Sequence, residues 1–313
     1  MNESKQPRFL ILRGGAIGDF VVTLPVLQAL RRRWPGAYVE LIGYPHIANL
    51  ALAGDLVDHV DSLDRADMAK FFTPTSTFSE AQAAHVRSFD LVISFLHDPQ
   101  GFVRDNLLAA GAPQVIYRSP IVPEGHAADH MLKALETLAI YEAGAHPRLA
   151  LRASLLDEGR RWLAGNSLAD RAWAIHPGSG SPKKNWPAER FAELAGRIRA
   201  DAGLRPFFIL GEADGAAAET LSKQSPDVPM LRDRTLVEVA SVLASCRGYV
   251  GNDSGVTHLA AALGIPVVAL FGPGDPVHWG PRGPKVRILQ ADGKDLGNLR
   301  VEDVLTAIRA TKS

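Results

Sequence analysis

The first segment whose residue types could do chemistry is GGAIGD, which spans residues 14–19. Gly14, Gly15 and Gly18 could let a backbone turn approach a phosphate, but a carboxylate beside a phosphate is electrostatically unfavourable. The turn therefore either binds a nucleotide or presents Asp19 as a proton acceptor. A structural interpretation is also open, in which the glycines form a tight turn and Asp19 is the N-cap of the next helix.

The glycine spacing argues against a dinucleotide-binding turn. The Gly-x-Gly-x-x-Gly pattern is absent from this segment. Dinucleotide sites also carry an acid at the end of the second strand, whereas Glu40 lies inside the predicted strand. A carboxylate for chemistry and a helix cap remain as the two main interpretations of Asp19.

The second segment, HPGSGSPKKNWP at residues 176–187, combines glycines, serines and two lysines. Serine hydroxyls and backbone N–H groups can hydrogen-bond phosphate oxygens, and a lysine can neutralise their charge. The segment follows a predicted strand, and open parallel sheets bind ligands at the carboxyl ends of their strands. We therefore favour an anion-binding loop over a solvated surface loop, with Pro187 as the first residue of a helix.

The third segment, GNDSGVTHLAAALG at residues 251–264, leads from a predicted strand into a helix that ends at Gly264. A helix N-terminus offers free N–H groups and the positive end of the dipole, so it can bind phosphate. Gly255 permits close approach and His258 could add a hydrogen bond. Alternatively, Asp253 or Ser254 only caps the helix and His258 only packs. Together with the lysine segment, this turn predicts a diphosphate site.

Strands and helices that alternate in two halves must position these segments. Apolar runs predict strands near 9–12, 38–44, 59–64, 89–95 and 113–118, and again near 172–178, 206–211, 248–253, 266–273 and 285–290. Helical spacing marks 25–34, 155–167, 188–200, 255–264 and 301–312, and a capping box from Thr235 to Glu238 begins another helix. The pattern predicts an α/β protein with two parallel-sheet domains, residues 1–155 and 156–313, and a ligand site in the cleft between them.

Composition excludes several classes of protein. Lys+Arg and Asp+Glu both number 34, which argues against a broadly basic nucleic-acid binder. A single cysteine, Cys246, allows no intramolecular disulfide and no all-cysteine metal site. The start of the chain lacks the apolar core of a signal peptide, and no apolar run reaches the ~18 residues of a membrane span. We expect a soluble cytoplasmic protein.

Other motifs have weaker implications. The cluster RRRW at residues 31–34 is either a solvated helix end or a contact with a membrane surface or an anionic acceptor. Aspartates recur every third residue from Asp55 to Asp67, and we interpret them as solvated surface. Asp-x-Asp, His-Glu-x-x-His, Gly-x-Ser-x-Gly and Walker A motifs are absent from the sequence, and we assign no metal ligand.

Three long segments resemble glycosyltransferase family 9, the bacterial ADP-heptose:lipopolysaccharide heptosyltransferases. They are ILRGGAIGDFVVTLPVLQALRRRWPGAYVELIG, AIHPGSGSPKKNWPAERFAELA and GNDSGVTHLAAALGIPVVALFGP. The resemblance implies a GT-B fold, in which two Rossmann-like domains face each other across a cleft and the last helix packs back on the first domain. It also implies an inverting transferase that moves a sugar, expected to be heptose, from a nucleotide diphosphate donor to a hydroxyl of the lipopolysaccharide core or a related glycan.

The resemblance also implies roles for particular residues. Asp19 matches the general base, and Gly14, Gly15 and Gly18 form the acceptor-side loop. The residues matched to donor binding are Ser179, Lys184, Asn185, Trp186, Gly211, Glu212, Arg234, Asp253, Ser254, Gly255, Val256 and His258. Arg234 stands where the family often has an apolar residue, which bears on the identity of the nucleotide base.

The expected partners follow from the same resemblance. They are an ADP-sugar donor, a glycan or glycolipid acceptor and the cytoplasmic face of the inner membrane, contacted peripherally, with no nucleic acid. No cofactor is required, because Lys184 and the N–H groups of residues 254–256 could stabilise the leaving diphosphate, although Mg²⁺ could assist. The alternative is a protein of the same fold that binds a nucleotide or nucleotide sugar without catalysis.

Overall fold

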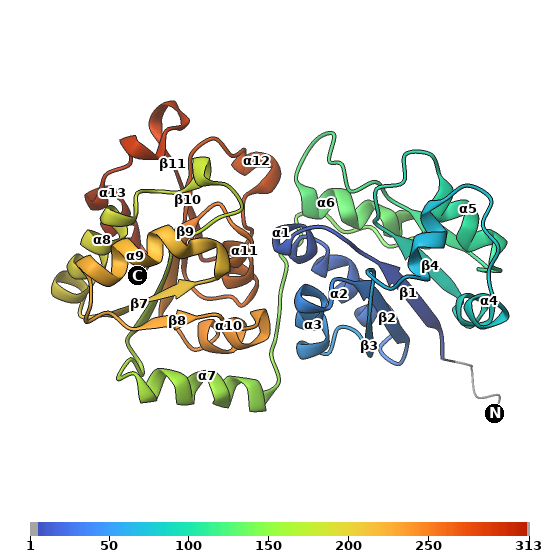
Figure 1. The fold of residues 1–313 in the computed structure, drawn as a ribbon, viewed down its shortest axis with the longest axis horizontal. Coiled ribbons are helices and arrows are strands. Elements are labelled where there is room, and N and C mark those ends of the chain that lie inside the picture. Colours follow the sequence, from blue (N-terminus) through green and yellow to red (C-terminus); the bar gives the residue numbers. More distant parts are fainter. Residues whose placement is uncertain (1–5, 312–313) are drawn as a thin grey trace. The chain divides into compact units, whose positions relative to one another are not determined.

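The computed structural model describes residues 6–311, and at residues 201 and 202 the backbone only. The chain divides between Ala145 and His146 into two compact units, each with its own parallel sheet (Figure 1). The domain boundary expected at 155/156 falls inside helix α7 (Ala153–Gly165), which belongs to the second unit.

The first unit has a five-stranded sheet in the order β3-β2-β1-β4-β5, in which every pairing is parallel. Each strand expected from an apolar run is present. In chain order the elements are β1 (Arg8–Leu12), α1 (Ile17–Val21), α2 (Leu24–Arg33), β2 (Tyr38–Gly43), α3 (Pro45–Ala53), β3 (His59–Ser62), η1 (Met68–Phe72), α4 (Glu80–Arg87), β4 (Leu91–Ser94), α5 (Phe102–Ala109), β5 (Val115–Tyr117), α6 (Ala127–Leu132) and η2 (Lys133–Leu138).

Strand β1 lies at the centre of this sheet. Its Ile11 pairs in register with Leu41 on one side and with Ile93 on the other, and all three side chains are buried. A parallel strand covered on both faces needs a continuous apolar run, which the sequence FLIL supplies. The chain leaves β1 at the carboxyl edge of the sheet, where Asp19 and the glycines before it follow.

The basic cluster RRRW lies at the end of α2, and its arginines contact groups of the same unit. Arg31 pairs with Asp58 and also donates to the carbonyls of Leu56 and Ala37. Arg32 pairs with Glu142. Cations at a helix C-terminus also interact favourably with its dipole, so contacts within the unit account for the position of this cluster at the end of α2.

The second unit has a six-stranded parallel sheet in the order β11-β10-β9-β6-β7-β8. Strand β8 was not expected, because three residues after a proline give no recognisable pattern. After α7 the elements are β6 (Ala172–His176), η3 (Pro182–Lys184), α8 (Ala188–Ala202), β7 (Arg205–Leu210), η4 (Glu212–Asp214), α9 (Gly215–Gln224), β8 (Met230–Arg232), α10 (Leu236–Leu243), β9 (Gly248–Asn252), α11 (Gly255–Ala262), β10 (Val267–Phe271), α12 (Pro276–Trp279), β11 (Val286–Gln290), η5 (Asp292–Lys294), η6 (Leu296–Asn298) and α13 (Val301–Ala310).

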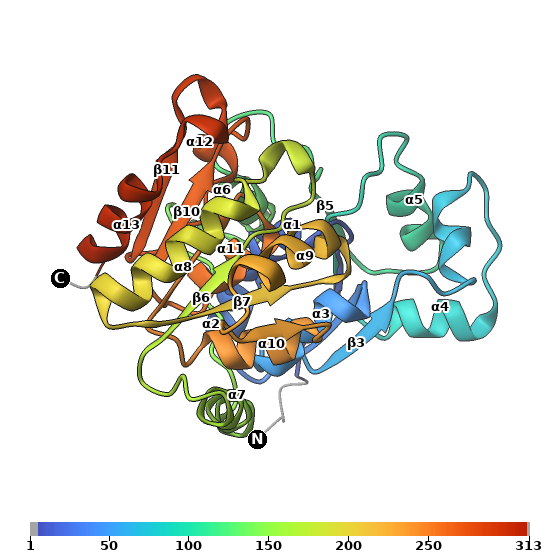
Figure 2. The ribbon, with the colours of Figure 1, turned by 60° about the vertical axis from the view of Figure 1, so that its left-hand side comes forward.

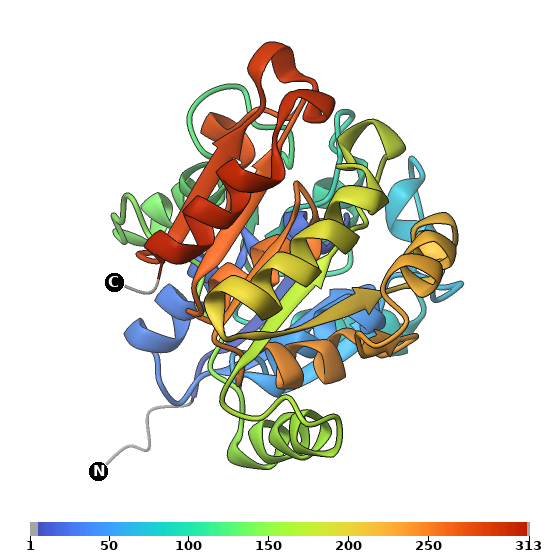
Figure 3. The same cartoon turned by 90° about the vertical axis from the view of Figure 1, so that its left-hand side faces the viewer.

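The last helix, α13, packs within the second unit. We expected it to return to the first domain, but its apolar side chains Val304, Leu305 and Ile308 are buried in the core that α8 and β10 also form. Figures 2 and 3 show α13 alongside α8 on one face of the sheet. Its apolar face therefore stabilises the unit that carries the lysine segment. No helix within residues 6–311 has both the length and the apolar character needed to cross a membrane.

Candidate functional site

Asp19 is the third residue of α1, and its carboxylate is fixed by the backbone before the helix. Oδ2 accepts a hydrogen bond from the Ala16 N–H at 2.9 Å. The N-cap position belongs to Ala16, so the expectation that Asp19 itself is the N-cap is wrong, although its side chain does satisfy a free N–H of the first turn. About one third of the side chain, 32%, is exposed, so the carboxylate is accessible as well as held.

Gly15 is required by this arrangement for two reasons. Its φ is +94°, in a region that side chains other than glycine rarely adopt. A Cβ at this position would also lie 2.9 Å from both Cβ and Oδ2 of Asp19. The turn therefore passes directly against the carboxylate. Gly14 is less constrained, since a Cβ there would make ordinary contacts of 3.5 Å, and Gly18 lies within α1.

Arg13 is a site residue that sequence reasoning missed. Its side chain is buried, and Nε and Nη2 donate to the main-chain carbonyl of Asp19 at 3.2 and 2.6 Å, while Nη1 donates to the carbonyl of Phe95. Nη2 also lies 3.7 Å from Oδ1 of Asp19. Burial lowers the pKa of Arg13 to about 10 and the Asp19 charge opposes this shift, so the guanidinium is cationic at neutral pH. The sequence signal that could have identified Arg13 is a charged residue directly after a buried strand.

A cavity of about 360 Å³ opens beside Asp19. Its walls come from the carboxyl ends of β1 and β4 and from the loops that follow β2, β3 and β5. The lining residues are Arg13, Gly14, Gly15, Asp19, Tyr44, Leu63, Asp64, Phe72, Phe95, Leu96, His97 and Pro120. We call it the Asp19 cavity. It has the position expected for a ligand site in a parallel sheet.

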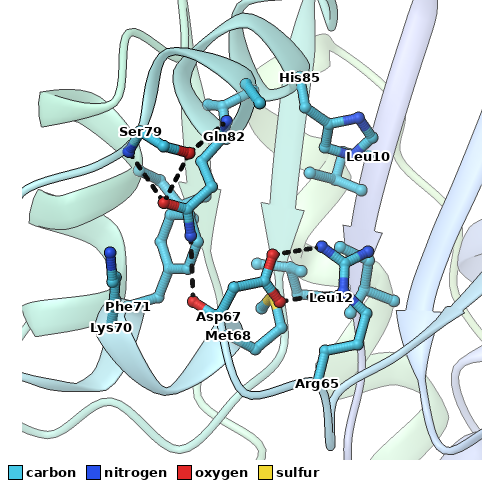
Figure 4. Close-up of a pocket in the computed structure, with 14 residues that line it drawn as sticks. Leu10, Leu12, Arg65, Asp67, Met68, Lys70, Phe71, Ser79, Gln82 and His85 are labelled. Carbon is cyan, nitrogen blue, oxygen red and sulfur yellow. Dashed lines mark hydrogen bonds and ion pairs between the residues drawn. The ribbon is translucent and has the colours of Figure 1, made fainter.

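A second cavity of the first unit, about 520 Å³, has an apolar floor that includes Leu10 and Leu12 (Figure 4). Its rim is held together by Arg65 paired with Asp67 and by Gln82, which donates to the carbonyl of Asp67 (Figure 4). Residues 63 and 64 line the Asp19 cavity while 65 and 67 line this one, so the segment 61–67 borders both cavities.

In the second unit, the lysine loop (residues 177–187) follows β6 at the carboxyl edge of the sheet. Ser179 Oγ donates to Asn185 Oδ1 at 2.6 Å or to the Ser181 carbonyl at 2.7 Å. Lys184 Nζ lies 2.7 Å from Oδ2 of Asp253, the residue just after β9. The structure thus brings Ser179, Lys184, Asn185 and Asp253 together, although they come from two segments of the sequence.

Trp186 anchors this loop from inside. Only 1% of it is exposed, its indole N–H donates to the Leu299 carbonyl, and its main-chain N–H donates to Asn252 Oδ1. The predicted donor-binding role is therefore indirect here, since the ring has no open face. Pro187 precedes α8 as its N-cap, not as its first helical residue.

Helix α11 begins at Gly255 and directs its N-terminus to the same edge. Ser254 is the N-cap, and its Oγ accepts from the Thr257 N–H. Because the first N–H groups of a helix lack acceptors within it, those of Gly255 and Val256 are available to an anion. His258 is buried one turn into the helix.

Two buried polar residues behind this turn were not expected. His176 ends β6, with Nδ1 3.3 Å from Ser254 Oγ and Nε2 3.6 Å from Oδ2 of Asp214. Burial raises the pKa of Asp214, but the adjacent His176 ring and the hydrogen bond from the Gly211 N–H outweigh it and leave the pKa lowered. A Cβ on Gly178 would lie 1.9 Å from Asp214 Oδ1, so this loop requires glycine there. Gly211 contributes to the site through its N–H, which donates a hydrogen bond to Asp214 Oδ2.

The remaining predicted donor residues are more peripheral. Glu212 is exposed at the start of η4, after β7. Arg234, which lies just before the N-cap of α10, pairs with Glu238 of that helix and lines a small cavity between α7 and α10, together with Trp162. Within the described part of the chain, no group of three or more His, Cys, Asp or Glu side chains is placed to hold a metal ion.

Comparisons with known proteins identify what the chain is similar to. A family model described as glycosyltransferase family 9 (heptosyltransferase) matches residues 126–308. Lipopolysaccharide heptosyltransferase 1 of Escherichia coli is 26% identical over 95% of this chain and 98% of its own length. Lipopolysaccharide heptosyltransferase 2 of Salmonella typhimurium is 36% identical over 35% of this chain and 33% of its own.

Solved structures agree on the fold. The family 9 glycosyltransferase from Veillonella parvula covers 97% of both chains with a TM-score of 0.81 at 20% identity. The E. coli heptosyltransferase WaaC, solved with ADP, covers 97% of this chain and 99% of its own with a TM-score of 0.73 at 24% identity. The fold is therefore GT-B, as the family resemblance implied.

Proposed function

Because the chain belongs to glycosyltransferase family 9, we propose that it transfers a heptose from ADP-heptose to a hydroxyl of the lipopolysaccharide core or a related glycan. The similarity to lipopolysaccharide heptosyltransferase 1, which spans 95% of the chain, supports the sugar and the acceptor. The observation that carries the proposal is the carboxylate of Asp19, held against the backbone at the wall of a cavity large enough for a sugar ring.

Asp19 is the general base in this proposal. An acceptor hydroxyl in the Asp19 cavity donates a hydrogen bond to the carboxylate, which takes its proton as the oxygen attacks the anomeric carbon. The Ala16 N–H fixes Oδ2, and Arg13 holds the main chain of Asp19. The carboxylate therefore needs little reorganisation when the proton moves.

The second unit stabilises the leaving group. As the glycosidic bond breaks, its electron pair passes to the diphosphate oxygen and the nucleoside diphosphate gains negative charge. Lys184 and the N–H groups of Gly255 and Val256 are the positive groups at that edge of the sheet. Asp253 holds Lys184 within 2.7 Å, so it positions the ammonium beside the helix N-terminus.

Direct displacement of this kind inverts the anomeric centre, because the acceptor attacks opposite to the leaving diphosphate. We assign no metal ligand among residues 6–311, and Mg²⁺ carried by the diphosphate itself is compatible with the mechanism. The acceptor proposed here is a glycolipid, so the reaction would take place at the surface of the inner membrane.

A transfer assay tests the function. The full chain is incubated with ADP-heptose and lipopolysaccharide from a heptose-deficient strain, and ADP release and the anomeric configuration of the product are measured. We expect one ADP per heptose transferred and inversion at the anomeric carbon. ADP and ADP-heptose should also raise the melting temperature, in contrast to UDP and GDP.

Binding of ADP-heptose without turnover on any acceptor would favour the alternative of a non-catalytic binding protein. Retention of the donor's anomeric configuration would contradict direct displacement with Asp19 as base.

A further inference from the structure

We propose that His176 takes up a proton when the nucleotide diphosphate binds, and that its imidazolium then orients the Ser254 hydroxyl toward the ligand. The same proton adds positive charge behind the diphosphate site. His176 is a positioning residue in this proposal, because it acts through Ser254. The inference rests on the proposed function, since it concerns the same site, and it comes from a chain of buried polar side chains.

Three buried side chains form a line behind the N-terminus of α11. His176, at the end of β6, lies between Asp214 and Ser254. Its Nε2 is 3.6 Å from Asp214 Oδ2, and its Nδ1 is 3.3 Å from Ser254 Oγ. The two ring nitrogens therefore face an acid on one side and the N-cap hydroxyl of α11 on the other.

Asp214 determines which ring nitrogen carries a proton when the ring is neutral. Although burial opposes it, the adjacent His176 ring and the hydrogen bond from the Gly211 N–H keep the pKa of Asp214 below its ordinary value, so this side chain is a carboxylate at neutral pH. A carboxylate only accepts hydrogen bonds. Nε2 of His176 therefore carries the proton, and Nδ1 is left as an acceptor for the Ser254 hydroxyl.

The other partners of Ser254 set this arrangement against a phosphate contact. Its Oγ accepts from the Thr257 N–H, and the Thr257 hydroxyl donates to the Asn252 carbonyl and so has no proton for Ser254. If the single hydroxyl proton of Ser254 turns to a phosphate oxygen at the helix N-terminus, two acceptors, Nδ1 and Oγ, face each other at 3.3 Å. A proton on Nδ1 removes this conflict, because an imidazolium donates from both nitrogens.

The charges near the ring favour the same change. Apart from His176, the charged groups of this chain of contacts are the carboxylates of Asp214 and Asp253 and the ammonium of Lys184. Lys184 is already paired with Asp253 at 2.7 Å, whereas a bound diphosphate adds further negative charge. Histidine is the side chain that ordinarily changes charge near neutral pH, so His176 can supply a positive charge when the ligand arrives.

The neighbouring elements carry three other titratable groups. Burial raises the pKa of Tyr249 on β9, so its hydroxyl stays neutral. Glu212, at the start of η4, is exposed to solvent. His258 is buried in the first turns of α11 and is the competing candidate for a proton. The experiment must therefore distinguish His176 from His258.

Calorimetry with ADP-heptose tests the inference in the full chain, without an acceptor. ADP-heptose is the suitable probe because the terminal phosphate of ADP itself titrates near pH 6 and would obscure a proton taken up by the protein. The binding enthalpy is measured at pH 7 in two buffers of different ionisation enthalpy, which gives the number of protons taken from the buffer. We expect wild type to take up protons, at most one for each ADP-heptose bound. Because the complex holds the extra proton, Kd should rise with pH, by at most about tenfold per pH unit.

Substitutions locate the proton. His176→Asn keeps a polar group toward Ser254 but cannot bind a proton, so uptake should disappear and Kd should lose its pH dependence. Asp214→Asn removes the carboxylate that stabilises the imidazolium and should reduce uptake. His258→Asn should retain the uptake even if its affinity is lower. His59→Gln, at an exposed histidine of β3, is the matched control and should behave as wild type.

The inference is overturned if wild type binds ADP-heptose without taking up a proton, if His176→Asn or Asp214→Asn keeps the full wild-type uptake, or if His258→Asn alone abolishes it. Asp214→Asn keeps the test decisive if His176→Asn does not fold. Failure of the proposed function has a different signature, namely proton uptake on binding without transfer to any acceptor. Absence of ADP-heptose binding would overturn both.

Discussion

Replacement of Gly15 by alanine should reduce transfer far more than it reduces stability. The backbone at this position has φ +94°, and an L side chain in the left-handed region costs about 1–2 kcal/mol. The new Cβ would lie 2.9 Å from both Cβ and Oδ2 of Asp19, a distance that real Cβ contacts do not reach. The carboxylate must therefore move, which weakens its 2.9 Å hydrogen bond from the Ala16 N–H.

The expected loss of activity follows from this displacement. A shift of the reacting group by about 1 Å can cost about 100-fold in rate, so kcat should fall by roughly that factor. For each variant, kcat for transfer from ADP-heptose and the free energy of unfolding in urea are measured and compared with those of wild type. Gly125→Ala is the matched control, because Gly125 has φ +70° and open space where its Cβ would lie. Both variants should lose the stability that the left-handed backbone costs, and Gly15→Ala should lose more because its Cβ also displaces the Asp19 carboxylate.

The outcome that refutes this reasoning is a Gly15→Ala enzyme whose kcat stays close to that of Gly125→Ala. Asp19 would then tolerate displacement, and its fixed geometry would be a by-product of helix capping.

Three further predictions concern the second unit. Lys184→Met should raise the Kd for ADP about tenfold or more and make that Kd less dependent on salt, because a charge-assisted contact is lost. Calorimetry measures both effects. An unchanged ADP affinity would show that Lys184 is not part of the diphosphate site. Trp186→Phe loses the hydrogen bond to Leu299 and should cost about 1 kcal/mol of unfolding free energy with little change in ADP affinity; the opposite pattern would indicate a direct ligand contact. The pKa of Asp214 is lowered from 3.8 in the fold, so its contribution to stability is present above that value and is lost as pH falls through the lower folded pKa. Asp214→Asn should therefore be less stable than wild type at pH 7, and its unfolding free energy should depend less on pH in acid. Identical pH profiles of the two proteins in urea unfolding would contradict this.

Much of the fold could be predicted from local pattern. The run FLIL before the glycine turn predicts a buried parallel strand, and β1 is that strand. Thr235 and Glu238 predict a capping box, and both hydrogen bonds of the box are present. Strand β8 and the packing of α13 were not predictable, because a three-residue strand has no period and a helix's apolar face does not specify its partner.

The site could be predicted only as separate segments. Asp19 and the lysine loop were recognised by residue type, but nothing local indicated that Lys184 pairs with Asp253. Arg13 and Asp214 were missed because each acts through contacts with residues distant in sequence or with main-chain groups. Trp186 was assigned to the donor by its match to the family's donor-binding loop, whereas its ring packs into the core.

The role of Asp19 as base is tested most directly by Asp19→Asn. Asparagine is nearly the same size and can still accept the hydrogen bond from the Ala16 N–H, so the helix cap is preserved and only the base is removed. We predict that transfer from ADP-heptose falls by about 10²–10⁴-fold, while ADP affinity and melting temperature stay close to those of wild type. Turnover near the wild-type rate in this variant would contradict the account and leave Asp19 as a helix-capping residue.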